Sequence, residues 1–169
     1  MKTAMKTGFW VLCSAALVLS GCSASSSMSK KERDAAAFQD VAELIESGNY
    51  MFTVRSASPS GGRTIQITSL YALRASDGTY SADLPYFGRA YAGGYGNEGG
   101  ITFSGEPEDL QINRNDSKNS ISVDFTIQTE QDRYTVTLNV GPSGYGNLTI
   151  SCQKRQTISY YGLAGELKD

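Results

Sequence analysis

The feature that most constrains the fold of this chain is an alternation of apolar and polar residues that recurs from Tyr50 onward. Its clearest run is the segment 121–128, ISVDFTIQ, in which every second residue is apolar. Successive side chains of a β-strand point to opposite faces of a sheet, so this run predicts a strand with one dry face and one wet face. One wet face indicates an antiparallel sheet, because parallel sheets are covered on both faces. The same alternation occurs at 50–54, 65–68, 134–140 and 148–152.

One helix is predicted ahead of these strands. The residues SKKE at 29–32 have the form of a capping box, in which a serine and a glutamate three residues later each bond the other's backbone amide. Apolar residues follow at helical spacing and Gly48 offers a stop, so a helix of about 18 residues is predicted. With Asp77-Gly78 as a hairpin turn between strands, the predicted fold class is α+β. In this fold an N-terminal helix packs on a curved, mostly antiparallel sheet of about nine strands, which forms a partly closed barrel or a sandwich.

The first residues carry a targeting signal and are not expected to belong to the fold. Lys2 and Lys6 precede an apolar run at 9–19 that is too short to span a bilayer, which is typical of a secretory signal. This run ends in LSGC, which resembles the lipobox of bacterial lipoproteins. The resemblance implies that Cys22 is acylated and becomes the mature N-terminus; the alternative is an ordinary signal peptide cut near Cys22. The expected division is a signal peptide at 1–21, a lipidated flexible tether at 22–28 and one globular domain at 29–169.

Acylation would make a membrane the first partner of this chain. Two or three acyl chains hold a protein firmly to a bilayer, whereas a single chain holds it only marginally. By resemblance to enterobacterial sorting, a serine at position 23 in place of an aspartate indicates the outer membrane. The tether contains no acidic residue, which favours the periplasmic side over the cell surface. The expected location is therefore the outer membrane, with the protein lipid-anchored and facing the periplasm.

Composition excludes several classes of function. The chain has no histidine, which removes Ser-His-Asp and Cys-His catalysis and every histidine-based zinc or haem site. With 15 Lys plus Arg against 17 Asp plus Glu and no basic stripe, nucleic acid is not an expected partner. No cofactor and no metal ion are expected, and no catalytic residue is assigned. Cys152 alternates in step with Leu148 and Ile150, so it is expected to be a buried small apolar residue and not a reactive thiol.

The stretch DLPYFGRAYAGGYGNEGG at 83–100 is the candidate contact region. Tyr86, Tyr91 and Tyr95 offer aromatic faces with polar tips, and Arg89 offers a planar fork for a carboxylate or a phosphate. These four are the candidate ligand-binding residues, for a small molecule, a glycan or an envelope protein. The structural alternative is that the glycines allow bends at a sheet corner, with the tyrosines covering the core edge and Arg89 paired to Asp83.

Two enzymatic interpretations of the same stretch are weaker. Residues 94–99 match the G-x-G-x-x-G pattern of dinucleotide sites, but such a site needs a helix next, and the following ITFS has the pattern of a strand. A glycoside hydrolase could use Asp83 and Glu98, provided that the two carboxylates lie within ~5 to 9.5 Å of each other. Nothing in their spacing fixes that distance. The expected function is therefore a non-enzymatic binding module, with a structural envelope protein as the alternative and the hydrolase third.

Several strings in the chain also resemble a known family. They are ESGNY at 46–50, DLPYFGRAY at 83–91, GGITFSG at 99–105 and ISYYG at 158–162. Together they are similar to a lipoprotein family of Bacteroidetes catalogued as domain of unknown function 4251, over roughly residues 38 to 165. The resemblance implies a secreted or lipid-anchored domain with no assigned activity. It brings no catalytic residues to this chain.

Overall fold

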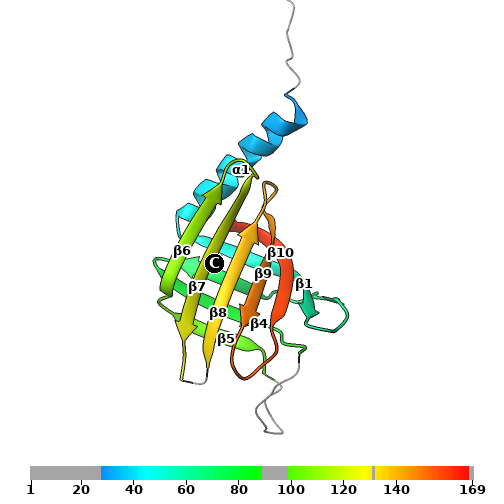
Figure 1. The fold of residues 1–169 in the computed structure, drawn as a ribbon, viewed down its shortest axis with the longest axis vertical. Coiled ribbons are helices and arrows are strands. Elements are labelled where there is room, and N and C mark those ends of the chain that lie inside the picture. The colour runs from blue at the N-terminus through cyan, green and yellow to red at the C-terminus, as the bar shows by residue number, and fades with distance from the viewer. Residues whose placement is uncertain (1–27, 89–98, 131, 168–169) are drawn as a thin grey trace, which may run out of the picture.

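The computed structural model describes residues 28–88, 99–130 and 132–167. These residues form one helix and ten strands, so the fold is mostly β (Figure 1). In chain order the elements are α1 (Lys30–Glu46), β1 (Tyr50–Pro59), β2 (Ile65–Gln66), β3 (Ala72–Ser76), β4 (Thr79–Leu84), β5 (Ile101–Gly105), β6 (Glu108–Asn115), β7 (Ser120–Gln128), β8 (Arg133–Val140), β9 (Tyr145–Ser151) and β10 (Ile158–Glu166).

All ten strands belong to one antiparallel sheet. Along the sheet the order is β5-β4-β3-β1-β10-β9-β8-β7-β6, and the short β2 pairs with β1. The sheet curls into a half-barrel, so that β5 contacts β7 across the interior. The predicted antiparallel sheet is confirmed. Of the predicted barrel and sandwich, the partly closed barrel is the one that forms, because the strands stay in a single continuous ladder.

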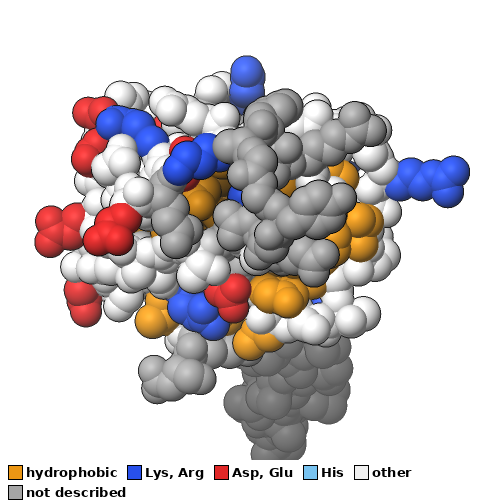
Figure 2. Space-filling model, turned by 90° about the horizontal axis from the view of Figure 1, so that it is seen from below, with side chains coloured by type: hydrophobic (Ala, Val, Ile, Leu, Met, Phe, Trp, Pro, Cys, Tyr) orange, Lys and Arg blue, Asp and Glu red, His pale blue; other side chains and the backbone are white. Residues whose placement is uncertain are grey.

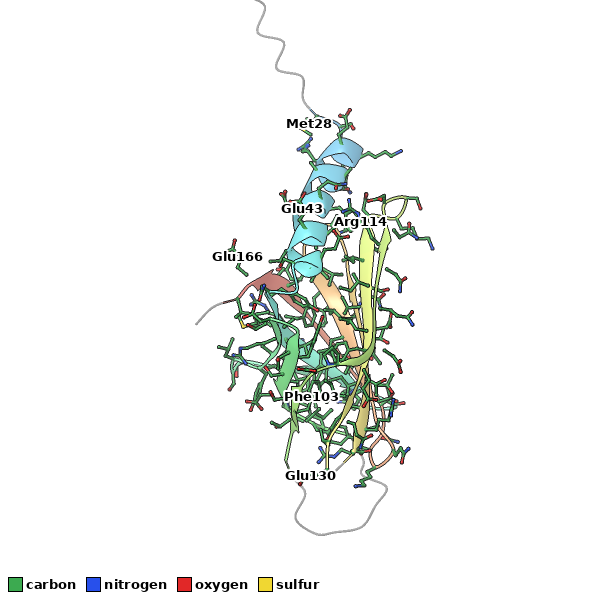
Figure 3. All side chains as sticks on the ribbon, turned by 90° about the vertical axis from the view of Figure 1, so that its left-hand side faces the viewer. Met28, Glu43, Phe103, Arg114, Glu130 and Glu166 are labelled. Carbon is green, nitrogen blue, oxygen red and sulfur yellow. The ribbon has the colours of Figure 1, made fainter. Side chains whose placement is uncertain are left out.

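The N-terminal helix begins at the predicted capping box. The backbone amide of Ser29 donates to Glu32 Oε2 at 2.7 Å, and the amide of Glu32 donates to Ser29 Oγ at 3.3 Å. The helix runs for 17 residues, and Gly48 follows it with a positive φ of 71°, which suits a helix stop. Phe38 is the first buried side chain of α1. The helix covers one end of the half-barrel, where it contacts β7 and β10 (Figure 3).

An arginine on β6 fastens α1 to the sheet. The guanidinium of Arg114 lies over the ring of Phe38, with 5.4 Å between Cζ and the ring centroid. Arg114 also pairs with Asp116 at 2.8 Å and with Glu46 at 3.6 Å, and it donates a hydrogen bond to Gln39. Exposed ion pairs contribute little because water screens them, whereas burying an aromatic side chain contributes ~1.5 to 3 kcal/mol. The packing of Phe38 therefore holds the helix more than the charges do.

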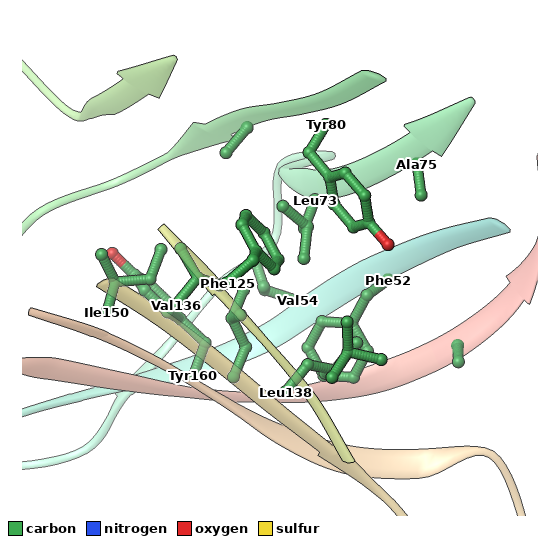
Figure 4. Packing of buried hydrophobic residues seen from close by; sticks show 14 of the residues in the cluster. Phe52, Val54, Leu73, Ala75, Tyr80, Phe125, Val136, Leu138, Ile150 and Tyr160 are labelled. Atoms are coloured by element: carbon green, nitrogen blue, oxygen red, sulfur yellow. The ribbon is translucent and has the colours of Figure 1, made fainter. Parts of the chain in front are cut away.

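The core lies on the concave face of the curl (Figure 4). Its side chains come from α1 and from every strand except β2 and β6. Tyr80 of β4 meets Phe125 of β7 with ring centroids 4.3 Å apart. Because β4 and β7 lie in opposite halves of the strand order, this aromatic contact joins the two halves without a backbone ladder between them.

A pair of glycines lies where β9 and β10 meet in the middle of the sheet. Gly162 of β10 pairs with Gly146 of β9, and both are buried. A Cβ atom at Gly162 would lie 2.3 Å from the carbonyl oxygen of Thr53, and one at Gly146 would lie 2.2 Å from that of Asn139. Those oxygens are backbone atoms, so neither position has room for a side chain. The missing side chains let the neighbouring strands close around the core.

Replacing Gly162 by alanine should destabilise the domain by about 1 to 3 kcal/mol, because the added methyl group would meet a backbone oxygen and the ring of Phe52. The matched change Gly165→Ala on the same strand should have little effect, since nothing lies within 4 Å of a Cβ atom there. Urea denaturation followed by circular dichroism measures both free energies of unfolding. Equal losses in the two variants would contradict this role for Gly162.

Candidate functional site

The end of the half-barrel opposite α1 is formed by three connections, and we call it the basal end. The connections join β4 to β5, β7 to β8 and β9 to β10, at residues 85–100, 129–132 and 152–157. Figure 3 shows Glu130 at this end and α1 at the other. Figure 2 views the basal end directly and shows hydrophobic side chains together with Lys and Arg side chains on this face.

Of the predicted contact residues, the structure describes Tyr86. The others, and the predicted lipidation site, lie outside the described residues: Arg89, Tyr91, Tyr95 and Cys22. The hydroxyl of Tyr86 donates to the carbonyl oxygen of Gln156 at 3.0 Å, and its half-buried ring packs against the core. Tyr86 therefore covers the core edge, as the structural alternative expects, and helps to build the basal end.

Arg155, which the sequence did not single out, organises the basal end. Its Nη1 atom donates to the carbonyl oxygens of Gly99 and Gly100, at 2.9 and 3.0 Å. The same guanidinium lies over the ring of Tyr86, with 5.1 Å between Cζ and the ring centroid. A cation–π contact of this kind contributes ~0.5 to 1 kcal/mol at an exposed site. Arg155 thus joins the β9–β10 connection to both ends of the β4–β5 connection.

Tyr160 holds the start of the β4–β5 connection from inside the core. Its hydroxyl donates to the carbonyl oxygen of Pro85 at 2.8 Å, although its ring is fully buried on β10. Burial raises the pKa of Tyr160, so the phenol stays protonated and remains a donor. At the other end of the connection, a Cβ atom on Gly100 would lie 2.2 Å from the carbonyl oxygen of Leu84. The two ends of the connection therefore meet backbone to backbone.

Asp132 joins the β7–β8 and β9–β10 connections. Its carboxylate accepts backbone hydrogen bonds from Arg133 at 2.9 Å, Gln153 at 3.3 Å and Lys154 at 3.2 Å. Burial by itself would raise the pKa of Asp132, but the Cys152 thiol and these amides donate to the carboxylate and together lower that pKa below its usual value. Asp132 stays ionised at neutral pH and fixes the backbone of the β9–β10 connection.

Cys152 lies half-buried beside Asp132, at the edge of the core. Its burial, and its hydrogen bond to the Asp132 carboxylate, raise the pKa of the thiol. A shallow pocket of about 200 Å³ lies over it, lined also by Arg133, Thr135 and Gln153. A thiol with a raised pKa is mostly protonated at neutral pH and is a weak nucleophile. Cys152 is less buried than the sequence predicts, but its expected lack of reactivity fits this environment.

Four titratable side chains at the basal end have pKa values shifted away from the neutral range. General acid–base catalysis needs a group that gains and loses a proton near the working pH. At neutral pH the Asp132 carboxylate is ionised. The Cys152 thiol and the phenols of Tyr134 and Tyr160 are neutral, because burial raises the pKa of each. None of these four groups is suited to act as a general base near neutrality.

Of the two enzymatic interpretations of this stretch, the described residues bear only on the dinucleotide match. Asp83 is exposed on the outer face of β4, and Glu98 lies outside the described residues. The strand predicted after residue 99 is confirmed as β5, so no helix follows the G-x-G-x-x-G match as a dinucleotide site requires. Within the described ranges, no three Cys, Asp or Glu side chains gather where they could hold one metal ion.

Two residues that organise the basal end carry weak sequence signals. Arg155 lies in QKRQ and Asp132 in TEQD, both of which are polar segments without alternation between predicted strands. The carbonyl groups that Arg155 binds lie 55 and 56 residues away from it along the sequence. Two of the backbone amides that bind Asp132 lie 21 and 22 residues away from it along the sequence. The one available hint was the place of both residues in short connections, where functional side chains are common.

Replacing Asp132 by asparagine should lower the free energy of unfolding at neutral pH and make it less dependent on pH. The pKa of Asp132 is lower in the folded state than in the unfolded state, so the carboxylate stabilises the fold above about pH 4. That effect is lost as the pH falls through the folded-state pKa, so the gap between wild type and Asp132→Asn should narrow in acid.

Urea titrations from about pH 7 to about pH 2 measure this gap. Asp40→Asn, at an exposed position on α1, serves as the control. A gap of constant size across the whole range would contradict the assigned role of the Asp132 carboxylate.

Comparisons with known proteins agree with this fold. Residues 32–164 match the family described as "Domain of unknown function (DUF4251)". A crystal structure of a DUF4251 family protein from Bacteroides eggerthii is similar, with a TM-score of 0.63 and 16% sequence identity, over 81% of this chain and 92% of that chain. At that identity the similarity shows the fold alone. No curated protein matches this chain.

Proposed function

Because the chain belongs to the DUF4251 family, whose description assigns no activity, we propose its function from the geometry of the basal end. It is a non-enzymatic binding module whose contact region lies within residues 83–100. One arrangement supports this proposal above all: Arg155 and Tyr160 hold the two ends of that region on a frame that is partly or fully buried. Rigid scaffolds commonly present their binding residues on loops held in this way.

The chemistry of the region suits a ligand with flat or apolar groups and an anionic group. The side chain of Phe87, next to the clamped Tyr86, is 44% exposed. In the proposal, Tyr91 and Tyr95 add aromatic contacts, and Arg89 pairs with a carboxylate or a phosphate. A small molecule, a glycan or an envelope protein can each offer such groups.

The domain is also proposed to be a lipoprotein of the outer membrane that faces the periplasm, with Cys22 as the acylated residue. The six residues of the tether, 23–28, would span at most ~20 Å. The α1 end would then lie near the lipid surface. Because α1 and the basal end are at opposite ends of the molecule, the contact region would point away from the membrane (Figure 1). In the described ranges, no helix is both long and apolar enough to cross a bilayer.

Acylation can be tested by labelling with a fatty acid. Cells that express the full chain should incorporate labelled palmitate into it, and Cys22→Ala should abolish the label because the acceptor thiol is gone. Cys152→Ala, which removes the half-buried thiol of the domain, should keep the label. Label that persists in Cys22→Ala, or that disappears in Cys152→Ala, would refute lipidation at Cys22.

The contact region can be tested by photo-crosslinking in intact cells. A photoreactive amino acid at position 87 should give a discrete crosslinked product, because Phe87 is exposed beside the proposed contact residues. The same amino acid at Leu110, which is similarly exposed on β6, should give none. Arg89→Ala and Tyr91→Ala should weaken the product without lowering the melting temperature. Equal products from positions 87 and 110, or none from position 87, would count against the proposal.

A further inference from the structure

A groove of about 480 Å³ crosses the outer face of the sheet, on the side away from the core. Its lining comes from β1, β3 and β10 and from the segment that precedes β3. Figure 3 shows Glu166, one of the lining residues, on the outside of the sheet. The groove shares no residue with the basal end.

The groove forms because β1 changes partners along its length. Its first half pairs with β3 and its second half with β2, and its register with β10 shifts at a bulge next to Arg55. The amide of Ile67 donates to the carbonyl oxygen of Arg55 at 2.9 Å, and the amide of Val54 donates to that of Tyr71 at 3.0 Å. The segment between these two bonds carries Leu70, which is 67% exposed. Bulges recur beside binding sites, where they redirect side chains.

The middle of the groove is apolar. Met51 and Leu163 line it from β1 and β10, and Leu70 lines it from the segment before β3. Gly165 is paired with Met51 and opens the floor, because a Cβ atom at that position would meet nothing within 4 Å. A single exposed leucine needs no explanation, but Leu70 shares its groove with two further apolar side chains. Together they form a surface on which an apolar chain can lie.

Two arginines line the same groove. Arg55 comes from β1 and Arg74 from β3, and neither forms an ion pair with a carboxylate among the described residues. Glu166 lines the groove as well but pairs with neither of them. A guanidinium presents a rigid fork of donors that matches a carboxylate or a phosphate. The charge of the groove therefore complements an anionic group.

We propose that this groove binds an anionic amphiphile, a molecule in which a carboxylate or phosphate head is joined to an apolar chain. The head pairs with Arg55 or Arg74, and the chain lies on the apolar middle of the groove. The volume falls within the roughly 300 to 1,000 Å³ that is usual for small-ligand sites. An extended peptide fits less well, because the backbone groups of β1 and β10 beneath the groove are already paired in the sheet. This site is independent of the function proposed for the basal end.

The test uses the full-length protein as cells produce it, mixed with vesicles of neutral phosphatidylcholine. The probe is an octyl phosphate that carries a photoreactive diazirine on its chain, and mass spectrometry maps the labelled peptides. The expected label falls on peptides that contain Met51, Leu70 or Leu163. Plain octyl phosphate and octanoate should compete with the probe. Octyl glucoside, which lacks the anionic head, and inorganic phosphate, which lacks the chain, should compete at least about tenfold less well.

Variants then assign the label to the groove. Combining Arg55→Gln with Arg74→Gln should reduce labelling about tenfold, since charge-assisted hydrogen bonds are lost. Gly165→Leu should abolish labelling by filling the floor. The matched controls are Arg63→Gln, at an exposed position outside the groove, and Gly105→Leu, at a glycine of β5 that also has open space. Both controls should label like the wild type.

Two results would overturn the proposal. One is unchanged labelling in the double arginine variant when circular dichroism shows that it is folded. The other is competition by inorganic phosphate as strong as that by octyl phosphate, which would mean a simple anion site. If Gly165→Leu does not fold, the labelling of the double arginine variant alone tests the proposal. Neither result bears on crosslinking at position 87, so failure of this site and failure of the basal contact region remain distinguishable.

Discussion

The backbone contact at Gly146 and Gly162 is the constraint on which the rest of the structure depends. Side chains at these two positions would collide with carbonyl oxygens of the neighbouring strands. The middle of the concave face therefore has to carry no side chain at these two positions. With that face bare, β9 and β10 can follow a tight curve and the two halves of the sheet can share one core. The curl also gathers three connections at one end, while α1 covers the other.

Local features of this fold could be predicted from the sequence, because they depend on neighbouring residues. The capping box at Ser29 and the alternation in segment 121–128 are of this kind. So is the turn at Asp77-Gly78, where both residues adopt the positive φ that a tight hairpin needs. The choice between barrel and sandwich was not predictable in this way, because it depends on whether distant strands can approach closely.

The candidate site was only partly predictable for a similar reason. Sequence reasoning assigned the guanidinium of the basal region to Arg89, the arginine nearest to the tyrosines along the chain. Arg89 lies outside the described residues, and the guanidinium that the structure shows over Tyr86 is that of Arg155, from a connection that follows nine of the ten strands. Long polar side chains in connections leave no periodic trace in the sequence, and their partners become apparent only when the strands are ordered. Aromatic residues close to the strand end, such as Tyr86, were easier to find.

The basal end is held together through main-chain groups of its connections. The guanidinium of Arg155 donates hydrogen bonds to backbone carbonyl oxygens, and the carboxylate of Asp132 accepts hydrogen bonds from backbone amides. Each charge is therefore paired with peptide groups. Peptide groups are the same whatever side chain each residue carries. A frame of this kind can therefore keep its shape when its side chains change.

The position of Phe38 in α1 has a mechanical consequence. Eight residues of the helix precede the first side chain that is buried, and at 1.5 Å per residue they extend about 12 Å from the body of the domain. A force applied to the chain on the N-terminal side of α1 would be transmitted through these eight helical residues to the buried side chains Phe38, Ala42 and Ile45. These residues belong to the same core as β7 and β10, so the load would be spread through the interior of the half-barrel and would not peel a strand from its edge.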